Sequence, residues 1–413
     1  MVCLSTCLSY GRAGLVWLTV LACPTRHNGL CGDQCKTNFT LSTIVVLVDF
    51  PDKKMGSDRV DSFNHRFFGP KGNVHEYYHE VSNGKVSFTG DVIGPFTLPK
   101  KLTQYANKKS GMGKSEPNVR TMARDTVNAI KTTHDLASYD NNGNGLVDAF
   151  VIVHAGWGAE EGGPNMKNGM WSLQWYIDEE PILVGGAGVF AFTTIPENAL
   201  LGVCVHEVGH LVFSWPDLYD GDPIATEGLG PWCLMAGGSW LGSPPVSKPC
   251  HPSAWCKASQ GWVQVINHIK NATIKLLEVK DSHQVHRLWT NGEKTSAEYF
   301  LLENRQKKQY DANLPESGLF IFHVDDKVED NDNELHYKFA MEQADGKNQL
   351  ATEWKEGDQL PWPGDPFPGI THVTFNANSE PNSRSYAKKD TFVSVTRISD
   401  SAQTMTMDIT VKI

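Results

Sequence analysis

The sequence predicts an α+β protein with a β-rich C-terminal region. Apolar, β-branched runs of strand length alternate with helical patterns as far as residue 213, which indicates that both strands and helices form there. After Trp262 the helical patterns give way to short strands. The 413 residues include 37 Gly and 22 Pro, so many loops and turns must connect these elements.

The first 213 residues are expected to hold four strands and three helices. The strands are runs of apolar and β-branched residues, and the helices show apolar residues at helical spacing or proline at the first turn. Strands are expected at 43–50, 85–98 (a strand or a hairpin), 148–154 and 189–195, and helices at 73–81, 117–134 and 198–213.

The rest of the chain is expected to be irregular over 221–265, where Gly, Pro and Trp are frequent, and then β-rich. The last strand alternates strictly between apolar residues such as Met405 and Met407 and polar residues, which is typical of an antiparallel strand with one buried face. Strands are expected at 297–303, 318–324, 392–398 and 404–413.

Charge and composition exclude several kinds of partner. Asp and Glu number 47 against 37 Lys and Arg, a net charge of −10, whereas nucleic acids and anionic membranes require a basic surface. No apolar run reaches the ~20 residues that span a bilayer. Arg12 and the apolar segment 13–22 are typical of an export signal, with an irregular N-terminal extension as the alternative. We therefore expect a secreted protein with no transmembrane anchor and no nucleic-acid partner, and assign residues 1–36 to the signal or extension.

The pattern His-Glu-x-x-His occurs twice, at 75–79 and at 206–210. On a helix its two histidines share a face, so they can bind one Zn²⁺ while the glutamate reaches a water molecule. The first copy lies in a short helix, and no carboxylate or histidine follows closely enough to be a third ligand. An ordinary histidine pair on a helix is the expected interpretation of that copy.

The second copy lies in an apolar helix that Pro216 ends, and Asp217 and Asp220 follow at once. One of these carboxylates would be the third ligand and leave the fourth position open for water, as catalytic zinc requires. Further along, Met235 precedes two glycines, and a tight turn there would place an apolar thioether beneath the metal. The alternative is a buried histidine pair that binds no metal.

Together these motifs resemble the immune inhibitor A-like secreted zinc metalloproteases of the metzincin clan. The motifs are His206-Glu207-x-x-His210, Pro216-Asp217-Leu218-Tyr219-Asp220 and Met235-Ala236-Gly237-Gly238-Ser239. The likeness runs from about Thr43 to Ile398, with further similar stretches at 139–156, 249–255, 298–305, 317–325 and 364–369.

The resemblance implies a metzincin-like catalytic domain over 37–265, with a mixed sheet and an active-site helix, followed by the β-rich region 266–413. It implies hydrolysis of peptide bonds in protein or peptide substrates, with a zinc-activated water as the nucleophile. The implied site has His206, His210 and Asp217 as zinc ligands, Glu207 as the general base and Met235 as the structural Met-turn.

One departure from the family pattern affects the third ligand. The family commonly has a glycine three residues after the second histidine, where this chain has Phe213, and Asp217 lies one residue further on than usual. The turn must therefore be made by 214–216. Asp217 is the expected ligand because it is the first carboxylate after the turn, and Asp220 and Tyr219 are the alternatives.

A second metal-binding pattern precedes the strand at 148–154. Oxygen ligands at positions 1, 3, 5 and 9 with glycine at position 6 match the first part of a calcium loop. Position 12 is Val151, which excludes an EF-hand, and both a bound Ca²⁺ and a plain turn rich in Asp and Asn fit the pattern. The candidate ligands are Asp140, Asn142, Asn144, Leu146 (through its carbonyl) and Asp148.

Three functions are compatible with these motifs. The leading one is an active secreted zinc endopeptidase. The second is an inactive or weakly active relative that serves binding or adhesion, which the missing glycine favours and the intact Glu207 opposes. The third is a zinc hydrolase that acts on bonds other than peptide bonds.

Overall fold

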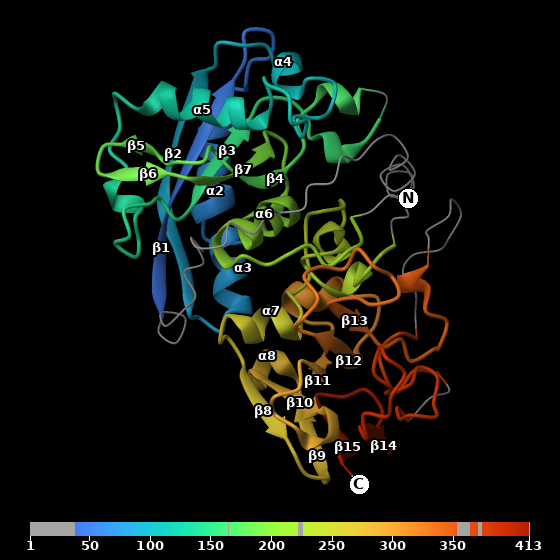
Figure 1. The fold of residues 1–413 in the computed structure, drawn as a ribbon. Helices are drawn as coiled ribbons and strands as arrows, with labels where there is room; N and C mark the ends of the chain where they lie inside the picture. Colours follow the sequence, from blue (N-terminus) through green and yellow to red (C-terminus); the bar gives the residue numbers. More distant parts are fainter. Residues whose placement is uncertain (1–37, 164, 222–225, 353–363, 371–373, 413) are drawn as a thin grey trace. The chain divides into compact units, whose positions relative to one another are not determined.

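The computed structural model describes residues 38–412 apart from 164, 222–225, 353–363 and 371–373, and it contains two compact units. The described residues of the first unit are 38–80 and 84–215, and those of the second begin at 81–83 and resume at 216 (Figure 1). The signal-like segment lies outside the described residues. This division into units does not test the domain boundary expected at residue 265, which stays a prediction.

A five-stranded sheet in the order β2-β1-β3-β7-β4 forms the frame of the first unit. It is a mixed sheet, because four strands are parallel to their neighbours and β4, at one edge, is antiparallel to β7. The segment 85–98 forms one strand and not a hairpin. The strands are β1 (Phe39–Asp49), β2 (Val86–Thr97), β3 (Phe150–His154), β4 (Leu173–Tyr176) and β7 (Ala191–Pro196), and β5 (Ile182–Val184) with β6 (Ala187–Val189) forms a separate hairpin.

Five α-helices accompany this sheet among the described residues (Figure 1). The helix expected over 117–134 is shorter than predicted; it begins after Asn118, whose side chain accepts a hydrogen bond from the Thr121 backbone, and ends at Ile130. The helices are α2 (Arg59–Phe68), α3 (Val74–Val81), α4 (Leu102–Ala106), α5 (Val119–Ile130) and α6 (Leu201–Phe213).

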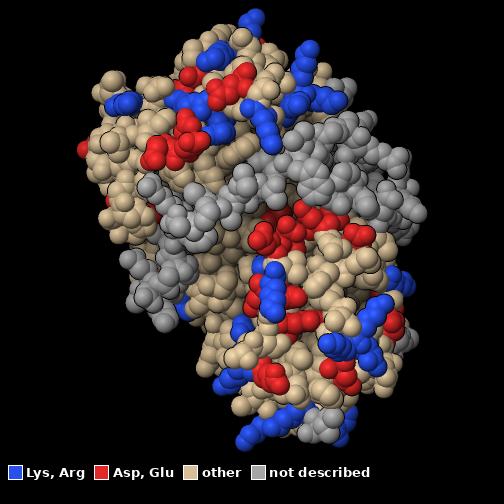
Figure 2. Space-filling view, in the orientation of Figure 1, with Lys and Arg blue, Asp and Glu red and all other residues tan. Residues whose placement is uncertain are grey.

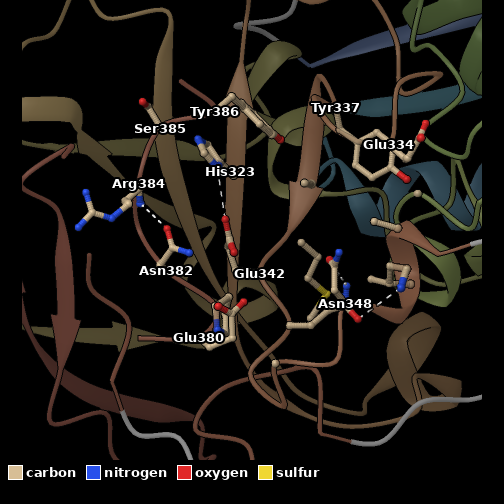
Figure 3. A pocket seen from close by; sticks show the side chains of 18 residues that line it. His323, Glu334, Tyr337, Glu342, Asn348, Glu380, Asn382, Arg384, Ser385 and Tyr386 are labelled. Atoms are coloured by element: carbon tan, nitrogen blue, oxygen red, sulfur yellow. Dashed lines mark hydrogen bonds and ion pairs between the residues drawn. The ribbon is translucent and has the colours of Figure 1, made fainter. Parts of the chain in front are cut away.

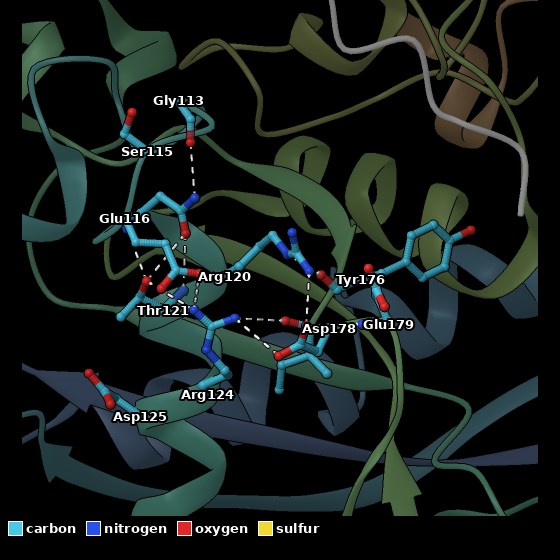
Figure 4. A network of polar contacts seen from close by, with 12 residues as sticks. Gly113, Ser115, Glu116, Arg120, Thr121, Arg124, Asp125, Tyr176, Asp178 and Glu179 are labelled. Atoms are coloured by element: carbon cyan, nitrogen blue, oxygen red, sulfur yellow. Dashed lines mark hydrogen bonds and ion pairs between the residues drawn. The ribbon is translucent and has the colours of Figure 1, made fainter.

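Arginines on α5 fasten the end of the edge strand β4. Arg120 lies 3.4 Å and Arg124 3.3 Å from the two carboxylate oxygens of Asp178, two residues beyond β4, and Arg124 also pairs with Glu116 (Figure 4). Arg120 Nε additionally donates to the carbonyl of Tyr176, the last residue of β4. The edge strand is therefore held at its far end by a polar network that includes one of its own backbone carbonyls.

Helix α6 is apolar over nearly its whole length, which suits a helix packed against a sheet. It contacts β7 and β4 on one side, and Tyr78 of α3 donates to the Val205 carbonyl at 2.5 Å. The helix ends at Phe213 because Ser214 adopts the left-handed conformation (φ 53°, ψ 33°) and Pro216 follows. None of the described helices has the length and apolarity needed to cross a membrane.

The second unit contains two antiparallel-rich sheets, in the orders β13-β12-β11-β10-β8 and β14-β15-β9. They share one apolar core, which includes Leu276, Phe300, Ile321 and Met407. The expected alternation of the last strand is present. The elements are α7 (Ala254–Ser259), β8 (Gln264–His268), β9 (Ala272–Leu277), α8 (Val279–Ser282), β10 (Gln284–Trp289), β11 (Glu298–Arg305), β12 (Gly318–Asp325), β13 (Phe339–Met341), β14 (Ser394–Thr396) and β15 (Thr404–Thr410).

A fully buried arginine supports the irregular segment of this unit. Arg305 pairs with Asp311 and donates to the carbonyls of Trp232 and His251, so one guanidinium holds two points of the segment that contains Met235. On the face shown in Figure 2, acidic and basic side chains are interspersed apart from one group of neighbouring acidic side chains.

Candidate metal centre

Two histidines of α6 converge on one point. Their spacing of four residues places them on the same face of the helix. The Nε2 atoms of His206 and His210 are 3.1 Å apart, and the ring planes are nearly perpendicular at 84°. Two imidazole nitrogens at this separation can both direct a lone pair at one cation, because ligands of tetrahedral zinc at ~2.1 Å lie roughly 3.4 Å from each other.

A backbone carbonyl orients His210. Its Nδ1 lies 2.6 Å from the carbonyl oxygen of Trp215, so Nδ1 carries the proton and Nε2 keeps its lone pair. The carbonyl reaches this position because the chain reverses at Ser214: the amides of Ser214 and Trp215 donate to the carbonyls of His210 (3.1 Å) and Gly209 (3.4 Å). Ser214 in a left-handed conformation thus makes the turn for which the family pattern has a glycine.

The carboxylate of Asp217 completes a group of three. One ligand atom each from His206, His210 and Asp217 lie within 4.8 Å of one another, and no other such group of three occurs among the residues that the structure describes. Asp220 is engaged elsewhere, since one of its carboxylate oxygens accepts a hydrogen bond from Thr226 at 3.1 Å. Two imidazoles and one carboxylate are a donor set that suits catalytic zinc.

Glu207 lies next to the first histidine and is 5% exposed. Its Oε2 is 3.2 Å from the hydroxyl of Thr193, which belongs to β7. The carboxylate is therefore directed towards the sheet that α6 packs against. Sequence reasoning did not find Thr193, because a threonine inside a buried strand carries no pattern that distinguishes it from any other strand residue.

Met235 is fully buried in a tight turn. The amides of Ala236 and Gly238 both donate to the Cys233 carbonyl at 3.0 Å, and a side chain at Gly238 would overlap that carbonyl and the Cys250 sulfur. The second glycine of the motif is thus required by close packing. The Met235 carbonyl in turn accepts a hydrogen bond from the amide of Leu218 at 2.8 Å, which ties the turn to the residue after Asp217.

The first His-Glu-x-x-His copy has a different environment on α3. Nδ1 of His75 lies within hydrogen-bonding distance of the backbone of Phe88 in β2, at 3.0 Å from its oxygen and 3.1 Å from its nitrogen. The rings of His75 and His79 are stacked 6.0 Å apart, compared with 4.7 Å for the pair on α6. This contact gives His75 a structural role between α3 and the sheet.

The polar groups of the oxygen-rich loop before β3 form hydrogen bonds with one another. Asp140 accepts hydrogen bonds from the amides of Gly143, Asn144 and Gly145 at 2.8–3.0 Å, and Asn142 donates to Asp148 at 2.8 Å. Asn144 accepts from the Leu146 amide at 2.9 Å, and burial raises the pKa of Asp148 to about 6. These are the bonds of successive Asx turns. They account for the composition of the loop, and the structure gives no support to a bound calcium ion.

A separate polar cavity of about 260 Å³ lies within the second unit (Figure 3). On its wall His323 is buried between two carboxylates, with Nε2 2.8 Å from Glu298 and Nδ1 3.3 Å from Glu342. Burial alone would lower the pKa of His323, but the two carboxylates outweigh burial and raise the pKa to about 8. None of the zinc-ligand candidates lines this cavity.

Comparison with known proteins finds relatives of about half of the chain. Residues 63–265 match the catalytic domain of the immune inhibitor A peptidases, family M6. Immune inhibitor A of Bacillus thuringiensis subsp. alesti is 30% identical over 196 residues, which are 40% of this chain and 28% of that protein. The pre-pro-metalloprotease PrtV of Vibrio cholerae is 26% identical over 270 residues, which are 53% of this chain and 29% of that protein. The matched part thus spans less than a third of either relative.

Proposed function

Since residues 63–265 carry a peptidase M6 domain of the immune inhibitor A type, we propose that this chain is a secreted zinc-dependent endopeptidase. The observation that supports this most strongly is the group formed by His206, His210 and Asp217, with Glu207 beside it on the same helix. A protein that only binds its partners would need no buried carboxylate next to a metal group. The intact Glu207 therefore favours hydrolysis over adhesion.

The chain's own residues would divide the work as follows. His206, His210 and Asp217 would hold the metal, and Trp215 would fix the tautomer of His210 through its carbonyl. A bound Zn²⁺ would supply Lewis-acid chemistry, lowering the pKa of a water molecule and polarising the scissile carbonyl. Glu207 would take a proton from the attacking water and return it to the leaving amine.

The edge strand β4 is the proposed docking site for the substrate backbone. Among the described strands β4 pairs with β7 alone, and its side chains are only partly buried. Arg120 bonds the carbonyl of Tyr176 at the end of β4, so the proposed docking site is the part of the strand before Tyr176. An extended peptide that adds to such an edge gains main-chain hydrogen bonds without depending on its sequence. Because α6 contacts both β4 and β7, a peptide there would lie close to the helix that carries the metal group.

The partners proposed for the chain are therefore protein or peptide substrates, with Zn²⁺ as the cofactor. Secretion is proposed from the apolar segment 13–22 together with the family match. The Met235 turn, bonded to the Leu218 amide, would hold the chain next to Asp217 in place.

The test is hydrolysis of denatured casein by the purified protein, by the protein stripped of metal with a chelator, and by the stripped protein after stoichiometric Zn²⁺ is restored. We expect cleavage, its loss on stripping and its recovery with zinc. Binding of casein without cleavage in all three samples would favour an inactive relative that serves binding or adhesion. Hydrolysis of a small ester but not of casein would favour a hydrolase of other bonds.

A further inference from the structure

The hydroxyl of Thr193 lies between two acceptors that belong to different elements. Its Oγ1 is 3.2 Å from Oε2 of Glu207 on α6 and 2.9 Å from the carbonyl oxygen of Leu173, the first residue of β4. Thr193 is fully buried and Glu207 nearly so, so water does not compete strongly for these bonds. We propose that Thr193 is a positioning residue that holds the general base Glu207 relative to the edge strand, an inference that rests on the proposed function.

The backbone of Thr193 makes it a rigid anchor. In β7 it pairs with Val151 of β3 on one side and with Gln174 of β4 on the other, so it sits inside the sheet with hydrogen-bonded strands on both flanks. A β-branched side chain in such a strand has little rotamer freedom. The sheet therefore fixes the position of the Thr193 hydroxyl, and this hydroxyl bonds to the Glu207 carboxylate.

The hydroxyl of Thr193 can bond to either of its two neighbours. A threonine hydroxyl has one proton to donate and lone pairs with which to accept. Thr193 can therefore donate to Oε2 of Glu207 or to the Leu173 carbonyl, one at a time. Both acceptors lie within hydrogen-bonding distance, so the hydroxyl sits between α6 and the first residue of β4.

The arrangement also links the base to the substrate site. Leu173 begins the strand proposed to dock the peptide, and the Thr193 hydroxyl lies within hydrogen-bonding distance of both that strand and the base. Thr193 thus lies between the edge strand and the carboxylate. Losing the hydroxyl should therefore impair turnover more than substrate binding.

The test uses three substitutions in the full chain. Thr193→Val keeps the shape and removes the hydroxyl, whereas Thr193→Ser keeps the hydroxyl. Thr194→Val is the matched control, because Thr194 is the neighbouring, equally buried threonine and faces the opposite side of the strand. With a fluorogenic peptide we expect Thr193→Val to lower kcat by about 10- to 100-fold with KM within about twofold, and Thr193→Ser to recover most of that loss. Zinc stoichiometry should be unchanged in all three.

A second readout needs neither zinc nor activity. In metal-free protein, a double-mutant cycle on thermal unfolding should show coupling of a few degrees between Thr193→Val and Glu207→Ala, and none between Thr194→Val and Glu207→Ala. Equal kcat for Thr193→Val and the wild type, or an equal loss in Thr194→Val, would overturn the proposal, as would absence of coupling. If the wild-type protein cleaves no peptide but the coupling is present, the contact between Thr193 and Glu207 is supported and the proposed protease function is refuted.

Discussion

At the scale of single residues, the metal group depends on which nitrogen of His210 carries its proton. The Trp215 carbonyl can only accept, so it fixes the proton on Nδ1 and leaves Nε2 facing Nε2 of His206. Glu207 lies next to these ligands but is held by Thr193, outside the ligand direction. The proposed ligand and the proposed base are therefore adjacent residues with separate roles, and the two roles can be tested separately.

The separation of roles predicts the behaviour of Glu207→Ala. This variant should bind zinc with the wild-type stoichiometry and lose at least about 100-fold in turnover, because a general base contributes a factor of that order. Zinc content by atomic absorption and casein hydrolysis would be measured on the same sample. If the variant loses its zinc as well, Glu207 is part of the metal site and the assignment of the base is wrong.

Asp217 and Asp220 provide the second test at this scale. Asp217 belongs to the group of three, whereas Asp220 is bonded to Thr226 in its own loop. Asp217→Ala should weaken zinc affinity by ~10-fold or more, since one of three protein ligands is lost. Asp220→Ala should have a smaller effect on zinc affinity. Competitive zinc titration of both variants decides the matter, and a larger loss for Asp220→Ala would transfer the ligand role to that residue.

At the scale of elements, the C-terminal end of α6 explains how this chain tolerates the loss of the family glycine. Ser214 has φ 53°, a conformation that costs a residue with a Cβ atom about 1–2 kcal/mol and costs glycine little. The turn nevertheless forms, because two backbone hydrogen bonds and the packing of Phe213 against Trp215, with ring centroids 5.0 Å apart, stabilise it. Ser214, the residue after the position of the missing glycine, therefore makes the turn in its place.

Substitution of Ser214 tests this account. Ser214→Gly should keep or slightly raise the free energy of unfolding, whereas Ser214→Val, which is β-branched, should lower it by about 1–2 kcal/mol relative to the glycine variant. The valine variant should also bind zinc more weakly, because the turn positions the Trp215 carbonyl that orients His210. Denaturant unfolding and zinc titration measure the two effects. Indistinguishable variants would show that the turn does not control the site.

Periodicity predicted the elements that matter most for the site. The strands at 43–50, 148–154 and 189–195 and the helix ending at Phe213 are present as β1, β3, β7 and α6, because each is a long apolar run with a clear stop. The short edge strand β4 was missed, since four half-buried residues give no periodic signal. It is tertiary pairing with β7 that makes this segment a strand.

The sequence also predicted part of the site, namely the candidate ligands, but not the hydrogen bonds that orient them. The spacing of His206 and His210 follows from helix geometry, and the helix stop at Pro216 made Asp217 the first available carboxylate. The bonds of Trp215 and Thr193 were not predictable, because they join residues through backbone direction and sheet register. For the loop at 140–148 the sequence pattern was ambiguous. Its oxygen-rich spacing suits both a bound cation and hydrogen bonds from the loop's own amides, and only the observed hydrogen bonds distinguish the two interpretations.

At the scale of the whole molecule, the pH dependence of stability should carry a contribution from His323. Its pKa is raised to about 8 from an ordinary value of 6.5, because Glu298 and Glu342 favour the charged ring more than burial opposes it. A raised histidine pKa stabilises the folded state fully below pH 6.5, and the stabilisation is lost as the pH rises through 8. The expected contribution at low pH is about 2 kcal/mol.

The measurement is the free energy of unfolding of the wild type, of His323→Gln and of His336→Gln between pH 5.5 and 9. The difference between wild type and His323→Gln should be largest near pH 6 and shrink as the pH passes 8. His336→Gln is the matched control, because its side chain is 38% exposed and pairs with Asp325. A difference for His323→Gln that stays constant with pH would mean that the ring is neutral in the folded protein.

One metal centre on α6 is proposed to give this chain its activity. The most direct measurement is an anomalous difference map, recorded at the zinc edge from crystals of the zinc-loaded protein. We predict one strong peak about 2 Å from Nε2 of His206, from Nε2 of His210 and from a carboxylate oxygen of Asp217. A peak between His75 and His79, or no peak at α6, would contradict the account.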